Sequence, residues 1–299
     1  MYWHEGFGLT IASQIHFPEL LSRKPGRTSD VRIHFDTSGK RIDEPGLGKK
    51  NPVITSSRYV LHIENVAWYH VENGSDIYIY PDGEADFRNI RAYLLSNAMA
   101  AIVLQRKRIL LHCAGIHING NISLIMGPSG SGKSTLLQGL LKRNYSAFTD
   151  DICVLQLETE GVFGTASYPM AKLWETSFSL LNLENFSREN VIWNGYKKYG
   201  IYFHEQFNCE KLNIQNIIIL EPCTGRLSLC NLSNTNAFFE IAKNTYRSEY
   251  ITPMNLTKVH FETISALVKQ SRVFKVCRNP EIEPIQKIVD TLEQILVKK

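Results

Sequence analysis

The segment MGPSGSGKSTLL, residues 126–137, sets three glycines and a lysine between an apolar run and a pair of leucines. It matches the phosphate-loop pattern G-x-x-x-x-G-K-[ST] at every position. Glycine in such a loop lets successive backbone N–H groups turn toward a phosphate, and the following helix adds the partial positive charge of its N-terminus. The flanks fit as well, because 122–126 is typical of a strand and 133–143 of a helix that stops at Asn144.

Each position of this loop has an expected task. The Lys133 ammonium would reach the β- and γ-oxygens of a nucleoside triphosphate, and the Ser134 hydroxyl would bind Mg²⁺. The pattern alone does not indicate which group accepts the phosphate. The predicted nucleotide contacts are Gly127, Pro128, Ser129, Gly130, Ser131, Gly132, Lys133, Ser134 and Thr135.

Two neighbouring carboxylates, Asp150 and Asp151, stand ahead of an apolar run and 17 residues after Lys133. A helix of about three turns and a short return would bring them back to the loop. One carboxylate could hold Mg²⁺ and the other could accept the proton of a substrate hydroxyl. A solvated turn is the structural alternative, because Asp-Asp is common in turns. In motor and transporter ATPases the acidic residues instead end a strand, and no transporter signature L-S-G-G-Q follows here.

Hydrophobic periodicity divides the chain into a β-rich domain, residues 1–85, and a domain that carries the loop, residues 86–299. We therefore expect an α/β fold, with a polar loop at 37–52 and an Asn119-Gly120 hairpin ahead of the phosphate loop. The other elements expected are strands near 109–118, 122–126, 150–151, 163–167 and 214–220, and helices at 86–106, 133–143, 233–245, 256–269 and 281–297.

Composition excludes several classes of function. A formal net charge of +4, from 33 basic and 29 acidic side chains, does not favour nucleic acid as a partner. The six cysteines form no C-x-x-C pair, which argues against a zinc site or a disulfide framework. No signal-peptide pattern and no apolar run of 18 residues is present, so we expect a cytoplasmic protein without a membrane partner.

The loop, its helix and the aspartate pair resemble, in order and spacing, the P-loop catalytic domain of HPr kinase/phosphorylase. That family also carries a histidine on the strand that enters the hairpin before the loop, and here His112 stands 21 residues before Lys133. The resemblance implies an HPr kinase-like P-loop core behind a small β-rich domain, with ATP and Mg²⁺ as cofactors. It also leaves open a homo-oligomer, because HPr kinases are hexameric.

The same resemblance implies a role for each site residue. Asp150 would be the general base, Asp151 would bind the metal together with Ser134, and His112 would lie near the transferred phosphate. A satisfied histidine on a buried strand is the alternative for His112. Cys113 follows this histidine where the family usually has glycine. No segment matches the signature tied to phosphorolysis and HPr docking, so neither property follows from the resemblance.

Segments outside the loop resemble a smaller group, the HPr kinase-like kinases that phosphorylate the C-terminal serine of lasso-peptide precursors. Those segments are residues 6–20, 167–174, 244–247 and 273–278. The resemblance implies an ATP-dependent kinase whose acceptor is a serine hydroxyl of a peptide. The alternatives are a kinase of HPr or of free serine and, from another class, a non-catalytic nucleotide-sensing module that binds a peptide.

Two basic residues in these segments are candidates for a clamp on phosphate or substrate. Lys172 could bind the γ-phosphate or a peptide carboxylate, and an exposed lysine on a strand is the alternative. Arg247 closes an apparent helix, where it could clamp a phosphate or only complement the helix dipole.

Overall fold

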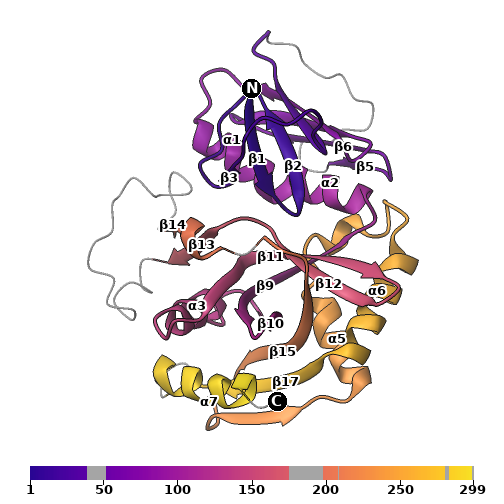
Figure 1. Ribbon diagram of the computed structural model, residues 1–299. Coiled ribbons are helices and arrows are strands. Elements are labelled where there is room, and N and C mark those ends of the chain that lie inside the picture. Colours follow the sequence, from indigo (N-terminus) through magenta and orange to yellow (C-terminus); the bar gives the residue numbers. More distant parts are fainter. Residues whose placement is uncertain (39–51, 175–197, 208, 280–282, 298–299) are drawn as a thin grey trace.

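The computed structural model describes residues 1–38, 52–174, 198–207, 209–279 and 283–297. The chain forms a mixed α/β fold of two large sheets and one small sheet, with a helical segment between the large sheets (Figure 1). Among the described helices, none is both long and apolar enough to cross a bilayer. The polar loop expected at 37–52 lies almost wholly outside the described residues.

The N-terminal sheet has eight strands in the order β3-β1-β2-β4-β8-β7-β6-β5. Its strands alternate between buried apolar and partly exposed polar residues, so that Ile77 and Ile79 are buried while Tyr78 between them is not. This period of two buries one face of the sheet. The strands are β1 (Tyr2–Gly6), β2 (Leu9–Ser13), β3 (Leu21–Ser22), β4 (Val31–Phe35), β5 (Val53–Ile54), β6 (Arg58–Ile63), β7 (Ala67–Glu72) and β8 (Asp76–Pro81).

The helical segment expected at 86–106 is confirmed, but a π-helical turn interrupts it. It consists of α1 (Phe87–Tyr93), η1 (Leu94–Ala98) and α2 (Met99–Gln105), and the Asp86 side chain caps its first turn. Residues 99–104 are all buried, because the segment lies between the two large sheets (Figure 1). One continuous core runs from the N-terminal sheet through α2 into the second sheet. The division into domains 1–85 and 86–299 stays a prediction.

The second sheet has seven strands in the order β10-β9-β11-β12-β15-β17-β16, and β10 also pairs in parallel with β15. The predicted hairpin between β9 and β10 is confirmed, and Asn119 and Gly120 both have positive φ, as such a turn requires. The strands are β9 (Ile109–Ile118), β10 (Asn121–Met126), β11 (Ser146–Glu158), β12 (Gly161–Ala166), β15 (Leu212–Pro222), β16 (Ser228–Asn231) and β17 (Arg272–Arg278). A separate two-stranded sheet pairs β13 (Met170–Trp174) with β14 (Lys198–Tyr202).

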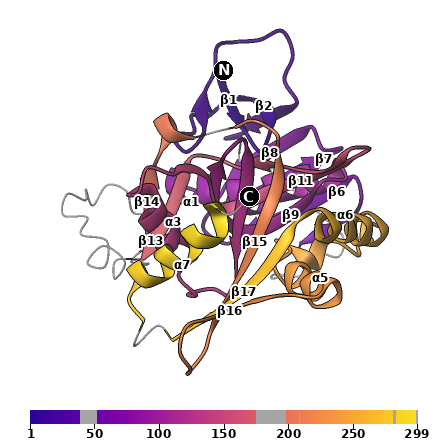
Figure 2. The same ribbon diagram turned by 60° about the horizontal axis from the view of Figure 1, so that its bottom comes forward.

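Helices cover both faces of the second sheet (Figure 2). On one face, α3 and α7 pack with Ile125, Ile218 and Val276 in one apolar cluster. On the other face, α6 contacts β9, β11, β12 and β15, and α5 packs beside α6. The described helices of this part are α3 (Lys133–Leu141), α5 (Asn234–Lys243), α6 (Thr257–Gln270) and α7 (Ile285–Val297), with short 3₁₀ turns η3 (His204–Gln206) and η4 (Ser248–Tyr250).

Most elements of this part lie where the periodicity predicts them, and the acidic strand is the main difference. The helix after the loop stops before Asn144, whose φ of 64° is the left-handed conformation expected of a stop. The strand expected near residues 150–151 is confirmed, although the aspartates do not stand ahead of its apolar run as an isolated pair. They lie inside the 13-residue β11, because β9 pairs with that strand from Ser146 to Leu155.

Candidate functional site

The predicted phosphate loop joins β10 to α3 and has a conformation that only glycine adopts freely. Gly127, Gly130 and Gly132 have φ values of 145°, 81° and 94°. A Cβ atom on Gly127 would lie 2.4 Å from the carbonyl oxygen of Leu220 on the neighbouring strand β15. The first glycine therefore allows the loop to leave the sheet directly against β15.

The loop lysine points back into its own loop. Lys133 is 7% exposed, and its Nζ donates to the carbonyl oxygens of Gly127 at 2.9 Å and Pro128 at 3.2 Å. Of the other predicted contacts, Ser131 and Thr135 are buried, Gly132 and Ser134 are half-buried, and Pro128, Ser129 and Gly130 form the exposed tip. The ammonium thus lies within the backbone ring that would surround a phosphate.

The acidic pair lies at the same edge of the sheet as the loop. Asp150 of β11 is paired with Ala114 of the neighbouring strand β9. On the other side of β9, Ala114 is paired with Ile125 of β10, two residues before the loop. Neighbouring strands lie about 4.8 Å apart, so this row spans roughly 10 Å. Ser134, in the first turn of α3, acts to lower the pKa of the Asp150 carboxyl, and α3 packs against β11. The loop helix therefore lies against the strand that carries the first aspartate.

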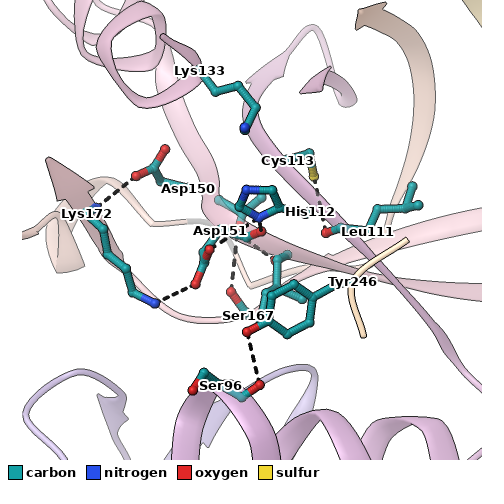
Figure 3. A network of polar contacts seen from close by, with 12 residues as sticks. Ser96, Leu111, His112, Cys113, Lys133, Asp150, Asp151, Ser167, Lys172 and Tyr246 are labelled. Atoms are coloured by element: carbon teal, nitrogen blue, oxygen red, sulfur yellow. Dashed lines mark hydrogen bonds and ion pairs between the residues drawn. The ribbon is translucent and has the colours of Figure 1, made fainter. Parts of the chain in front are cut away.

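One residue, Lys172 on β13, holds both carboxylates. Its backbone N–H donates to Oδ2 of Asp150 at 2.9 Å, and its ammonium donates to Oδ2 of Asp151 at 2.5 Å (Figure 3). The Tyr168 hydroxyl donates to the same oxygen of Asp151 at 3.4 Å. Lys172 is thus a buried partner of the acidic pair in this structure, which differs from the exposed lysine of the structural alternative.

The two neighbouring carboxyl groups have opposite pKa shifts. Burial raises the pKa of Asp150 to about 7, against the opposing effect of the hydrogen bonds from Lys172 and Ser134. Burial also acts to raise the pKa of Asp151. The Lys172 ammonium and His112 outweigh this effect, so the resulting pKa lies far below the usual range of a carboxyl group. Asp151 is therefore ionised near neutral pH, while Asp150 can exchange a proton there.

His112 lies on β9, opposite Ile152 of β11, with its ring beside the acidic pair (Figure 3). Its Nδ1 is 3.0 Å from the backbone carbonyl oxygen of Asp151 and 3.4 Å from Oδ1 of the same residue. A carbonyl oxygen only accepts hydrogen bonds, so Nδ1 carries a proton in this contact. The ring also lines a cavity in front of the loop.

That cavity has a volume of about 320 Å³ and lies between the loop and the turn that follows α5. Asn244 joins the two walls: its Oδ1 accepts from the N–H of Gly127 at 3.1 Å, and its backbone oxygen accepts from the N–H of His112 at 2.7 Å. The lining residues are His112, Gly127, Pro128, Ser129, Lys243, Asn244, Thr245, Tyr246 and Arg247.

Arg247 lies in this turn and not in a helix, because α5 already ends at Lys243. Its φ of 56° is left-handed, which is uncommon for a residue with a side chain. The guanidinium donates through Nε to the carbonyl oxygen of Ser96 at 3.3 Å and lies against the rings of Tyr246 and Tyr250. These contacts keep a cation at the wall of the cavity.

The structure therefore gathers the predicted loop, Asp150, Asp151, His112, Lys172 and Arg247 around one site. Sequence reasoning did not predict the part played by Asn244 in joining the two walls. The residues of its contact with Gly127 are 117 positions apart, and no local pattern signals such a pair. Among the described residues, no three His, Cys, Asp or Glu side chains cluster as a metal site would require.

Comparisons with known proteins add little to this geometry. Neither the models of protein families nor the curated sequences contain a match to this chain. Among solved structures, the chain is similar to the Hpr(Ser) kinase/phosphatase from Coxiella burnetii, with 13% identity and a TM-score of 0.32. The match covers 62% of this chain and 89% of that one. At this identity and TM-score, the similarity assigns neither a family nor an activity to the chain.

Proposed function

We propose that the protein is an ATP- and Mg²⁺-dependent kinase that transfers the γ-phosphoryl group to a serine hydroxyl of a peptide. The place of Asp150 beside the loop helix, in the strand row that leads to the loop, supports this proposal most directly. It sets a carboxylate beside the residue that would face the metal and the terminal phosphate. Phosphoryl transfer needs little beyond such positioning and charge stabilisation.

In this proposal Asp150 is the general base. A base works best when its pKa lies near the working pH, and burial raises the pKa of Asp150 to about 7. Asp151 is poorly suited to this task, because the Lys172 ammonium holds it in the ionised form. The two carboxylates therefore have separate roles, although they are neighbours in the sequence.

The residues present fit Mg²⁺, which prefers oxygen ligands and is usually held by one or two protein groups together with substrate phosphates. Ser134 and Asp151 would hold it, and when bound it would neutralise charge on the phosphate oxygens. For Asp151 to bind a metal, the Lys172 ammonium must turn to another acceptor. The γ-phosphate is such an acceptor, which agrees with the clamp role proposed for Lys172.

We assign the acceptor to the cavity beside His112. Its volume of about 320 Å³ is at the small end of ligand pockets, so it suits one side chain and not a folded surface. The Arg247 cation at its wall could bind a carboxylate or a phosphate of the substrate. A C-terminal serine carries both a hydroxyl and a carboxylate, so the proposed acceptor is the last residue of a peptide, as in a lasso-peptide precursor.

The test is to incubate the protein with labelled ATP, Mg²⁺ and one acceptor at a time, followed by mass spectrometry of the product. The acceptors are a peptide ending in serine, the same peptide with an amidated C-terminus, free serine and HPr. We expect phosphate on the first and much less on the amide. Label on HPr or free serine would replace the proposed acceptor, and tight ATP binding without transfer to any of them would favour a sensor.

The matched variant is Asp150→Asn, which keeps the shape of the side chain and removes the base. We expect a loss of transfer of about 10²- to 10⁴-fold, the usual contribution of general base catalysis. Calorimetry should show Mg²⁺-dependent ATP affinity within about twofold of the wild type, because the loop is untouched. Equal loss of binding and transfer would contradict the assigned role.

A further inference from the structure

Arg278 ends β17 at the edge of the sheet from which the phosphate loop leaves. The strands β10, β15 and β17 are parallel neighbours, so their carboxyl ends meet at this edge. Met126 of β10 is level with Ile219 of β15, and Pro222 of β15 is level with Arg278. The arginine therefore extends beyond the start of the loop, where ligands of open α/β sheets bind.

The guanidinium of Arg278 lies directly against the loop. A Cβ atom on Gly132 would be 2.7 Å from Nη2 and 3.4 Å from Cζ of this arginine. Gly132 has a φ of 94° and immediately precedes the first residue of α3. The place that a side chain would take at the last loop glycine is thus taken by a cation of another strand.

This cation has no acidic partner among the described residues. Its side chain is half-buried and makes no hydrogen bond or ion pair there, whereas Lys275 on the same strand pairs with Glu221. Burial lowers the pKa of Arg278, but a guanidinium stays protonated at neutral pH. Partial burial of a charge without a counter-ion is unfavourable, so an anionic ligand would stabilise this arrangement.

A second group inside the loop also lacks a partner in the described part of the chain. Ser131 is 3% exposed, and its hydroxyl makes no hydrogen bond. This oxygen lies 3.1 Å from the position that a Cβ atom of Gly127 would take, so it is next to the first glycine of the loop. A buried hydroxyl without a partner is uncommon in folded proteins, and a phosphate oxygen would satisfy it.

We propose that Arg278 is a nucleotide-binding residue whose guanidinium contacts the inner phosphates of a nucleoside di- or triphosphate. The acidic pair on β11 is reached from β10 across β9, and Arg278 on β17 is reached from β10 across β15. The two therefore flank the loop on opposite sides. Since the γ-phosphate must face the acidic pair, Arg278 faces the other end of the phosphate chain. This assignment rests on the proposed nucleotide-dependent function.

The test compares Arg278→Gln and Arg278→Lys with the wild type by calorimetry, using Mg²⁺ with ATP, ADP or inorganic tripolyphosphate. A charge-assisted hydrogen bond contributes enough for Arg278→Gln to weaken all three by about 10- to 100-fold. Arg278→Lys should recover part of the affinity. The control is Arg272→Gln, which removes the same charge from the other end of β17, about 20 Å away, and should leave the affinities unchanged.

Each other result has a distinct meaning. Unchanged or increased affinity in Arg278→Gln overturns the inference and leaves the kinase proposal standing. A loss of affinity for ATP alone would indicate that Arg278 contacts the γ-phosphate. A loss of affinity for ATP and ADP but not for tripolyphosphate would indicate that it contacts the nucleoside. Either result overturns the assignment. If the wild type binds none of the three ligands, both proposals fail. Transfer activity does not enter these measurements, so its absence would count only against the proposed function.

Discussion

Two ion pairs, Arg32–Asp76 on the N-terminal sheet and Lys172–Asp151 beside the second sheet, differ in how far the cation is exposed to solvent. On the N-terminal sheet, Arg32 forms a two-pronged pair with Asp76, and these side chains are 61% and 13% exposed, so that the cation of this pair faces solvent. Where the small β13–β14 sheet meets the second sheet, Lys172 of β13 pairs with Asp151 of β11, and these side chains are only 18% and 13% exposed. An exposed pair exchanges one set of water contacts for another and contributes little, whereas a buried pair must hold two desolvated charges.

This difference distinguishes an ion pair on the surface of the N-terminal sheet from one beside the candidate site. A buried ion pair is weak evidence for stability, because the cost of desolvation can exceed the attraction between the charges. The pair of Lys172 and Asp151 lies beside Asp150, whose own charge is disfavoured by burial. A chemical task explains this arrangement better than packing does. The comparison makes four predictions, which run from the largest expected effect to the smallest.

Lys172→Met should have the largest effect on stability. It leaves Asp151 buried without its counter-ion, and breaking such a pair typically costs about 3–5 kcal/mol of the free energy of unfolding. Urea titration would measure the loss. The double variant Lys172→Met/Asp151→Asn should recover most of it, because no isolated charge remains. A double variant as unstable as the single one would show that the lysine acts by packing and not by charge.

Gly127→Ala should follow. The added Cβ meets the carbonyl oxygen of Leu220 at 2.4 Å, and alanine is strained at a φ of 145°. Strain and overpacking together should cost about 2–4 kcal/mol and displace the loop. Gly130→Ala is the matched control, because a Cβ on Gly130 meets nothing within 4 Å, although its φ is also positive. Similar losses in both variants would mean that backbone strain alone, and not the approach to β15, decides the effect.

Asn244→Ala should have a smaller effect, and on binding more than on folding. It removes the acceptor for the N–H of Gly127, and one hydrogen bond of this kind contributes about 0.5–1.5 kcal/mol. We expect nucleotide affinity to fall about three- to tenfold. Asn236→Ala, in the exposed first turn of α5, serves as the control. Unchanged nucleotide affinity in Asn244→Ala would show that the contact between the turn after α5 and the loop does not contribute to binding.

Arg32→Gln should have the smallest effect. The arginine of this pair is exposed and screened by salt, and the largely buried Asp76 keeps its hydrogen bond from the Ser75 hydroxyl and its contact with His34, so the loss should leave the midpoint of urea unfolding within experimental error. The same titration in 0.5 M salt is the control, since it weakens surface pairs and hardly touches buried ones. A loss of unfolding free energy close to that of Lys172→Met would show that the two ion pairs do not differ in their contribution to stability.

Short sequence patterns predicted the loop, the hairpin turn and the helix stop better than they predicted features that depend on strand pairing. The turn at Asn119-Gly120 and the stop at Asn144 follow rules that act within a few residues, and the structure agrees with both. The loop at 127–134 joins a strand to a helix as expected, while its binding of a phosphate stays a prediction. The π-turn at Leu94–Ala98 had no such signal. The strand expected near residues 150–151 is present, but its length on both sides of the aspartates had no local signal and depends on pairing with β9.

From the amino-acid order alone, a glycine-rich loop that matches the phosphate-loop pattern, its helix and a nearby acidic pair could be located, since glycine conformation and helix periodicity are local properties. Only the folded chain shows that Lys172 holds both carboxylates, that Asn244 joins the loop to the turn after α5, and that Arg278 lies against Gly132. Such contacts depend on strand register and on which strands are neighbours. Register and strand order follow from the packing of the whole core, to which residues far apart in the chain contribute together.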